Sequence, residues 1–105
     1  MLSVGDVELD PATRTVRQQG RPVELTSVEF NLLEALLRDA GRVVTREHLV
    51  LAVLGRKFSP FDRSIDMHVS KVRKKLGDSE RSPEHIKTIR GVGYIFARPR
   101  EEAKA

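Results

Sequence analysis

The chain has 105 residues, no cysteine and a formal net charge of +4, with a pI of about 9.9. This length allows one domain with a single hydrophobic core, and the composition excludes a disulfide framework, a thiol nucleophile and a membrane span, which needs about 18 consecutive apolar residues. Without a signal-peptide pattern we expect an intracellular protein, and the positive charge favours an acidic partner, either nucleic acid or an anionic membrane surface.

Residues 2–25 alternate between apolar and polar side chains in short runs. The runs predict four strands, at 2–4, 7–9, 15–17 and 23–25. Turn-forming pairs separate them, at Gly5-Asp6, Asp10-Pro11 and Gln19-Gly20. We expect a small antiparallel meander with one buried face, and its balanced charge indicates a platform rather than a binding surface.

Thr26 and Glu29 stand at the spacing of a capping box, in which each side chain hydrogen-bonds the backbone N–H of the other residue. The apolar residues that follow recur at helical spacing, and they are Phe30, Leu33, Leu36 and Leu37. We therefore expect a helix as far as residue 39, with its leucines in the core. Gly41 is expected to end it in the left-handed conformation.

A second helix-start signal lies at Thr45. Leu49, Ala52 and Val53 predict an inward-facing stripe as far as Gly55, so this helix should be short.

The connection to the next helix comprises residues 55–62, GRKFSPFD, with two aromatic residues and one proline. It ends in two candidate caps, Ser59 and Asp62, for a helix that begins at residue 63. Two helices joined by a short irregular loop, the second basic and followed by a hairpin, are typical of a winged helix-turn-helix.

Residues 63–76, RSIDMHVSKVRKKL, form the helix around which the other elements are organised. At about 100° per residue one narrow stripe is apolar and must face a core, and it comprises Ile65, Val69, Val72 and Leu76. The opposite face carries mostly cations and small polar groups, namely Arg63, Met67, Ser70, Lys71 and Lys74. Such a helix suits the DNA major groove, and a solvated surface helix is the alternative interpretation.

Positive charge is segregated with this helix. Residues 1–52 contain six basic and eight acidic residues, whereas residues 53–105 contain thirteen basic and seven acidic residues. This asymmetry favours a nucleic-acid contact over a solvated face.

The segment TIRGVGY, residues 88–94, predicts a hairpin of two short strands, 86–89 and 94–97. Its glycine turn carries Arg90 at the tip, for which minor-groove insertion and a structural salt bridge are the two hypotheses. We expect the hairpin to return the chain to the N-terminal sheet.

Four motifs occur in order, TSVEFNLLEALL, RVVTREHL, DRSIDMHVSKVRKKL and TIRGVGYIF, within a match that covers about residues 2–98. Together they closely resemble the C-terminal effector domain of OmpR/PhoB-type response regulators, and FSPFDRSIDMHVS most resembles the Cpx-type envelope-stress regulators. The resemblance implies an α+β winged helix-turn-helix with a four-stranded antiparallel N-terminal sheet, three helices and a C-terminal β-hairpin wing. We expect this DNA-binding domain at 1–98 and a disordered tail at 99–105.

The resemblance also implies a DNA-binding site. The third helix would read the major groove, and its residues that match DNA-contacting positions are Arg63, Ser64, Met67, His68, Ser70, Lys71, Arg73 and Lys74. Arg90 would enter the adjacent minor groove. We expect Lys71 to contact base edges.

Other matched positions contact the sugar-phosphate backbone in the family. Thr88 and Tyr94 match two of them, and Arg63 and Lys74 are further candidates for phosphate contacts. Arg46, at the start of the second helix, is an additional candidate.

The chain departs from the family pattern at three positions. Ser70 and Lys71 stand where arginines are frequent, and lysine cannot form the bidentate fork that arginine makes with guanine, so the DNA sequence preference should differ. Leu54 stands where many members have a tryptophan, so we do not expect a backbone contact from that ring.

The resemblance implies several partners. Family members usually pair in tandem on direct repeats of double-stranded DNA, and the loop matched by residues 55–62 contacts RNA polymerase. A receiver domain, phosphorylated through a sensor kinase, controls the pairing, and this chain is too short to contain one. We expect the effector part of a bacterial regulator that works in the cytoplasm at the nucleoid, without membrane contact.

Asp66 and His68 also have interpretations within the domain itself. Asp66 precedes Ser70 and Arg73 by one and two helical turns, so we expect an intrahelical polar pair that holds Arg73 while Arg73 also reaches a phosphate. His68 borders the apolar stripe, which favours a half-buried histidine over a direct phosphate contact.

The sequence does not indicate a metal site, a cofactor or an enzyme. His48 and His85 have no cysteine or carboxylate at ligand spacing, and Gly91-Val-Gly93 lacks the context of a phosphate-binding loop. The competing hypothesis is a winged helix that binds an acidic protein through its basic helix. Arg90 distinguishes the two hypotheses, because protein docking has no evident need for an arginine between glycines.

Overall fold

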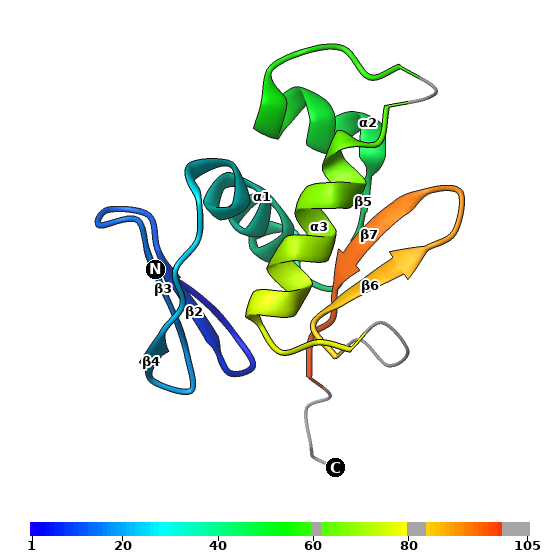
Figure 1. Ribbon diagram of the computed structural model, residues 1–105. Helices are drawn as coiled ribbons and strands as arrows, with labels where there is room; N and C mark the ends of the chain where they lie inside the picture. The colour runs from blue at the N-terminus through cyan, green and yellow to red at the C-terminus, as the bar shows by residue number, and fades with distance from the viewer. Residues whose placement is uncertain (60–61, 80–83, 100–105) are drawn as a thin grey trace.

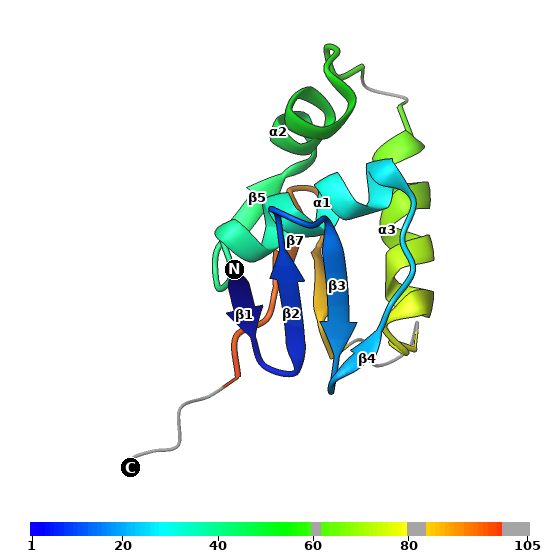
Figure 2. The same cartoon turned by 90° about the vertical axis from the view of Figure 1, so that its left-hand side faces the viewer.

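The computed structural model describes residues 1–59, 62–79 and 84–99, so that all of the predicted tail except Pro99 lies outside the described residues. The strands are β1 (Leu2–Val4), β2 (Val7–Asp10), β3 (Thr15–Gln18), β4 (Arg21–Pro22), β5 (Val43–Thr45), β6 (Ile86–Ile89) and β7 (Gly93–Phe96). The helices are α1 (Ser27–Arg38), α2 (Arg46–Leu49), the π-helix η1 (Val50–Leu54) and α3 (Ser64–Lys75). Helices α1 and α3 lie between two antiparallel sheets (Figures 1 and 2), which confirms the predicted α+β class.

The N-terminal sheet has four strands in the order β1-β2-β3-β4, as predicted. The fourth strand, however, is Arg21–Pro22 and does not extend over 23–25. Gln19 and Gly20 both have positive φ, 53° and 79°, and form a tight turn that pairs Gln18 directly with Arg21. The strand therefore begins immediately after the turn, and Val23 and Leu25 are partly buried against the core on the way to α1.

Helix α1 begins with the predicted capping box. Thr26 Oγ1 accepts the Glu29 N–H at 3.2 Å, and a Glu29 carboxylate oxygen accepts the Thr26 N–H at 2.9 Å. Gly41 is left-handed, with φ of 85°, but its N–H donates to the carbonyl of Phe96 in β7 at 2.9 Å. It therefore links the end of α1 to the C-terminal sheet, and Asp39 is the C-cap of the helix.

The second helix is capped by Thr45, whose side chain accepts the N–H of His48, and it continues into the wider turns of η1. The predicted inward stripe is wrong at Ala52, which is exposed, because Val50 takes the fully buried position beside Leu49. A π-helix has more than four residues per turn, so the inward positions fall later than α-helical spacing places them. The helix ends at left-handed Gly55.

The C-terminal hairpin pairs with β5 in a separate sheet of order β5-β7-β6, and does not return to the N-terminal sheet as expected. Strand β5 has three residues, too few for an alternating pattern to reveal it. The approach of β5 to β7 is close, since a Cβ on Gly93 would lie 2.0 Å from the Val44 carbonyl oxygen. Glycine at this position is therefore required for the sheet to form.

The apolar stripe predicted for α3 is confirmed. Its four residues, Ile65, Val69, Val72 and Leu76, are at most 3% exposed and belong to one core with the α1 leucines. This packing directs the opposite face of α3 outward. None of the helices in the described residues is long and apolar enough to cross a bilayer.

Candidate nucleic-acid interface

The outward face of α3 carries the cations that the sequence indicated. Arg63, Lys71 and Lys74 are exposed, and Met67 between them is 59% exposed. Across the described residues, the side chains of these three cations form no hydrogen bond or ion pair. They are therefore available to an external anionic partner.

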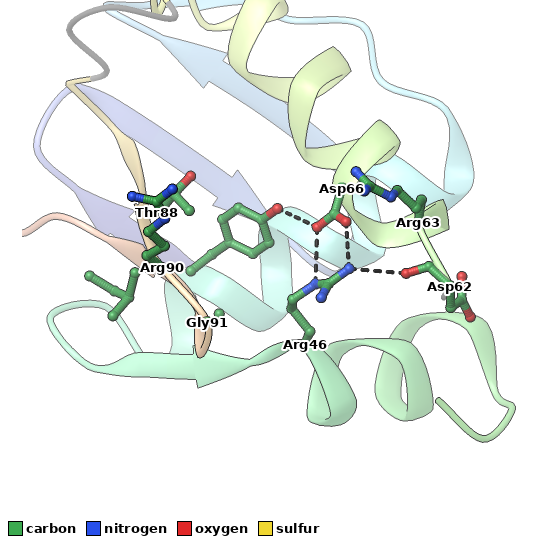
Figure 3. Close-up of a pocket in the computed structure, with 10 residues that line it drawn as sticks. Arg46, Asp62, Arg63, Asp66, Thr88, Arg90 and Gly91 are labelled. Atoms are coloured by element: carbon green, nitrogen blue, oxygen red, sulfur yellow. Dashed lines mark hydrogen bonds and ion pairs between the residues drawn. The ribbon is translucent and has the colours of Figure 1, made fainter. Parts of the chain in front are cut away.

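The wing formed by β6 and β7 places another free cation beside α3. The turn closes with a hydrogen bond from the Val92 N–H to the Ile89 carbonyl at 2.9 Å, and Gly91 has φ of 75°. Arg90 occupies the exposed tip and, among the residues that the structure describes, has no side-chain partner. The predicted glycine turn is thus confirmed, and Figure 3 shows Arg90 on the wing, where it is one of the residues that line a groove.

An open groove of about 660 Å³ separates the N-terminal turn of α3 from the wing. Its lining includes the predicted site residues Arg46, Arg63, Thr88, Arg90 and Tyr94. The structure therefore brings together side chains from α2, α3 and the wing that lie far apart in the sequence.

Asp66 lies at the base of this groove and pairs with residues outside its own helix. Arg46 donates from Nε to Oδ1 at 3.1 Å and from Nη2 to Oδ2 at 2.5 Å, and the Tyr94 hydroxyl donates to Oδ1. The predicted intrahelical pair with Ser70 and Arg73 is therefore wrong. Burial, and then the hydrogen bond to Asp66, raise the pKa of Tyr94 to about 12.

Arg73 faces the wing strands. Its Nε donates to the Ile86 carbonyl at 2.9 Å, its Nη2 donates to Thr88 Oγ1 at 2.6 Å, and its guanidinium lies 5.6 Å from the centre of the Tyr94 ring. The expected hold by Asp66 is thus replaced by contacts with β6 and β7. Arg73 joins the last turn of α3 to the wing.

The remaining predicted site residues lie around this surface. Thr88 is exposed, whereas Ser64, His68 and Ser70 are half-buried. The half-buried position predicted for His68 is confirmed, and its Nδ1 is buried without a hydrogen-bond partner in the part of the chain that the structure describes.

The start of α3 is fixed by Asp62. Its Oδ1 accepts the Ser64 N–H at 3.0 Å and the Ser64 hydroxyl at 2.6 Å, and its carboxylate pairs with Arg56. Neither of the two predicted caps is the N-cap residue, which is Arg63 and makes no side-chain cap hydrogen bond; Asp62 instead holds the first helical residue, Ser64. The predicted polymerase-contacting loop, 55–62, includes two residues, 60–61, that lie outside the described residues.

A cluster missed by the sequence analysis anchors the exit of α3. His85 Nδ1 lies 2.6 Å from an oxygen of Asp78, and its Nε2 lies 2.8 Å from an oxygen of Asp6. Asp6 belongs to the first turn of the chain, so no sequence spacing could have revealed the contact. All three side chains are engaged with one another, and the cluster joins the N-terminal sheet to the start of β6.

The fold and this surface define a winged-helix domain with a basic outward helix and an arginine-tipped wing. The chain belongs to the family described as "Transcriptional regulatory protein, C terminal", whose model matches residues 20–96. The resemblance to OmpR/PhoB-type response regulators is thereby confirmed.

Similarity to characterised members is high. The chain is 45% identical over 95 residues to the transcriptional regulatory protein CpxR of Escherichia coli K12, which covers 90% of this chain and 41% of that protein. It is 40% identical over 99 residues to the DNA-binding response regulator MtrA of Mycolicibacterium smegmatis, covering 94% of this chain and 43% of that protein. The chain thus spans about two fifths of these curated relatives.

Solved structures of the same family superpose closely. The Klebsiella pneumoniae RstA DNA-binding domain, in complex with its RstA box, has a TM-score of 0.88 at 38% identity and covers 91% of this chain and 95% of that chain. The DNA-binding domain of CpxR from E. coli has a TM-score of 0.84 at 42% identity, and the match covers 92% of this chain and 95% of that chain.

Proposed function

We propose that this domain binds specific sequences of double-stranded DNA as the output domain of a two-component response regulator that controls transcription. The observation that carries the proposal is a group of exposed cations whose side chains have no partner among the described residues: Arg63 just before α3, Lys71 and Lys74 on α3, and Arg90 on the wing. A helix of this kind fits the major groove, and an arginine on a narrow turn fits the minor groove.

Each part of the surface has a distinct proposed role. Lys71, at the centre of the outward face, donates to base edges, and Arg90 reads the adjacent minor groove. Arg63 and Lys74 bind phosphates and fix the position of the domain on the duplex. Further proposed contacts come from Ser64, Met67, His68, Ser70 and Thr88, whose side chains lie on the same surface.

Arg46, Arg73 and Tyr94 belong to the predicted contact set, but their polar atoms are already engaged within the domain. Arg73 contributes by holding Thr88 and the wing strands against α3. A direct phosphate contact from Arg46 or Tyr94 would have to coexist with the Asp66 carboxylate.

Similarity to the RstA domain in complex with an RstA box supports DNA as the partner. From the family resemblance we further propose that the full-length protein carries a receiver domain under a sensor kinase, and that two copies pair in tandem on direct repeats. Residues 55–62 are the proposed surface for RNA polymerase. The domain itself catalyses no reaction, and it acts in the bacterial cytoplasm at the nucleoid.

A selection experiment tests the proposal. Wild type, Arg90→Ala and Arg17→Ala are each mixed with a randomised duplex pool, and the retained DNA is sequenced. We expect the wild type to enrich one short motif, and Arg90→Ala to lose part of the enrichment, at a cost of about 1–3 kcal/mol in affinity for the motif. Arg17→Ala removes an exposed arginine from β3 and should behave as wild type.

Retention without any enriched motif, and with no effect of Arg90→Ala, would contradict specific groove reading. An acidic protein would then be the partner to seek for the basic helix.

A further inference from the structure

We propose that Asp66 determines DNA specificity without touching DNA, by fixing the distance between the recognition helix α3 and the wing. This inference rests on the proposed function. It adds a residue that positions the DNA-contacting side chains without being one of them. Arg46 and Tyr94 then act through Asp66 and not as phosphate ligands.

The first support is that one carboxylate joins three elements. Asp66 stands in the first turn of α3, Arg46 begins α2, and Tyr94 belongs to β7. Arg46 makes a two-point contact with both carboxylate oxygens, and the Tyr94 hydroxyl donates to one of them. A fork of this kind fixes orientation as well as distance, because both N–H bonds must be satisfied together.

The second support is that Arg46 bridges the wing and α3 through two different parts of the same residue. Its backbone N–H donates to the Val92 carbonyl in the wing turn at 3.2 Å. Its side chain reaches Asp66 and also donates from Nη2 to the Asp62 carbonyl at 3.0 Å, just before α3 begins. Figure 3 shows the guanidinium of Arg46 between Asp62 and Asp66. The wing tip and the start of α3 are thus connected through a single arginine.

A second connection lies two helical turns further along α3, where Arg73 holds Thr88 and the Ile86 carbonyl. The wing is therefore held to α3 at two positions along the helix. Two such connections fix the angle of the wing as well as its distance from α3. Asp66 lines the same groove as Arg90, so its contacts bear directly on where the wing arginine lies relative to α3.

The charges at the base of the groove favour positioning over phosphate binding. The Asp66 side chain is 26% exposed and presents a carboxylate beside Arg46, whose side chain is 31% exposed. A phosphate approaching Arg46 would meet this carboxylate, and Tyr94 is only 6% exposed. Arg63 and Arg90 line the same groove and have no side-chain partner in the described part of the chain, so they are the better phosphate and base ligands.

The consequence concerns specificity. Lys71 and Arg90 read two different grooves, and both can bind well only if their separation matches the duplex. Loss of the contacts made by Asp66 should leave the cations of the DNA-binding surface able to bind phosphates, so binding to random DNA should persist. The added affinity that Arg90 provides at the selected site should diminish.

A double-mutant cycle tests this inference on three conservative variants: Tyr94→Phe, Asp66→Asn and Arg46→Lys. For each variant, with and without Arg90→Ala, the affinity is measured for the motif that the wild type enriches and for random duplex DNA. The salt dependence of binding and the midpoint of thermal unfolding are measured on the same proteins. In the wild type, Arg90→Ala should weaken site binding by roughly 5- to 150-fold. In each variant the same substitution should cost at least about threefold less, because a wing no longer fixed by Asp66 cannot hold Arg90 in its best position, and the two changes are then not additive.

Direct phosphate contact makes opposite predictions. If Arg46 bound a phosphate, Arg46→Lys would retain the charge and the site preference, whereas the positioning role requires the fork and loses preference. If Tyr94 bound a phosphate, Tyr94→Phe would weaken selected and random DNA alike. Thr13→Val, which removes an exposed hydroxyl from the β2–β3 turn, is the control and should change nothing.

The outcomes separate the two proposals. An undiminished cost of Arg90→Ala in all three variants overturns the positioning role and leaves specific DNA binding intact. No cost of Arg90→Ala even in the wild type overturns the proposed function itself. A variant with a lowered thermal midpoint is assayed below that temperature, so its affinities refer to folded protein.

Discussion

Lys75 in the last turn of α3 places its Nζ 2.6 Å from a carboxylate oxygen of Glu29 in α1, and the Glu29 side chain is only 2% exposed. The same oxygen accepts the Thr26 N–H, so it completes the capping box and holds α3. Burial opposes ionisation, but the hydrogen bonds from Lys75 and Thr26 outweigh it and keep the pKa of Glu29 below its usual value. Lys75 therefore belongs to the packing of α3 on α1, and not to the cations free to bind phosphates.

This relationship predicts that Glu29→Gln lowers the free energy of unfolding by about 1–3 kcal/mol, because the substitution leaves Lys75 without its buried partner. Urea denaturation measures the loss. Glu34→Gln is the control, since Glu34 pairs with Arg38 on the partly exposed face of α1 and should cost no more than about 1 kcal/mol. Equal losses of unfolding free energy in the two variants would show that the buried Glu29–Lys75 pair stabilises the fold no more than an exposed pair does.

His85 predicts a loss of stability as the pH rises. Burial opposes protonation of the ring, but hydrogen bonds to Asp78 and Asp6 outweigh it and raise the pKa of His85 above 6.5. A raised pKa in the folded state stabilises the fold fully below the unfolded value, and the contribution disappears as the pH rises through the folded value. The free energy of unfolding should therefore fall above pH 6.5, by at most about 1.4 kcal/mol per pH unit.

The control for this pH dependence is a second histidine. His85→Gln should remove the decline, whereas His48→Gln, at an exposed position on α2, should retain it. In acid the sign reverses, because the pKa of Asp78 is lowered from 3.8 and its contribution is lost as the pH falls below that value. A flat stability profile from neutral to mildly alkaline pH in the wild type would refute the imidazolium cluster.

Local patterns predicted α1 and α3 correctly because the causes of these two helices are local. The stripe of α3 depends on helical geometry alone, and all four of its residues are buried. The capping box depends on two residues three positions apart, and both hydrogen bonds are present. The family resemblance added the wing and its relation to α3, which the residue pattern suggested only in outline.

Contacts between distant segments could not be predicted. Asp66 has partners 20 and 28 residues away, and His85 has a partner 79 residues away. Sequence spacing suggested neighbours on the same helix for Asp66, although the fold brings α2 and β7 closer to its carboxylate. The short strand β5 was missed for a similar reason, since only its pairing with β7 identifies it.

We expect alanine to lower the free energy of unfolding by different amounts at Gly93 and at Gly20. A Cβ on Gly93 would meet the Val44 carbonyl oxygen at 2.0 Å, so Gly93→Ala must push β5 from β7 and should cost more than about 3 kcal/mol. Gly20 has φ of 79° but nothing within 4 Å, so Gly20→Ala meets only the conformational cost of about 1–2 kcal/mol. Urea denaturation of both variants checks the difference, and a Gly93→Ala loss no larger than that of Gly20→Ala would contradict the close approach of the strands.

The free cations predict a steep salt dependence of DNA binding. If roughly four to six phosphates are neutralised, log K against log salt concentration should have a slope of about −4 to −5 per bound domain.

Lys74→Ala removes a cation without internal partners in the described residues, so it should weaken all DNA sequences alike and reduce the slope by about 1. Lys75→Ala removes a cation of the same helix that is paired with Glu29, so it should lower stability and leave the slope near that of the wild type. Fluorescence anisotropy over a range of salt concentrations measures both slopes. Because the two lysines are adjacent, a difference between them can arise only from the direction in which the fold turns each side chain.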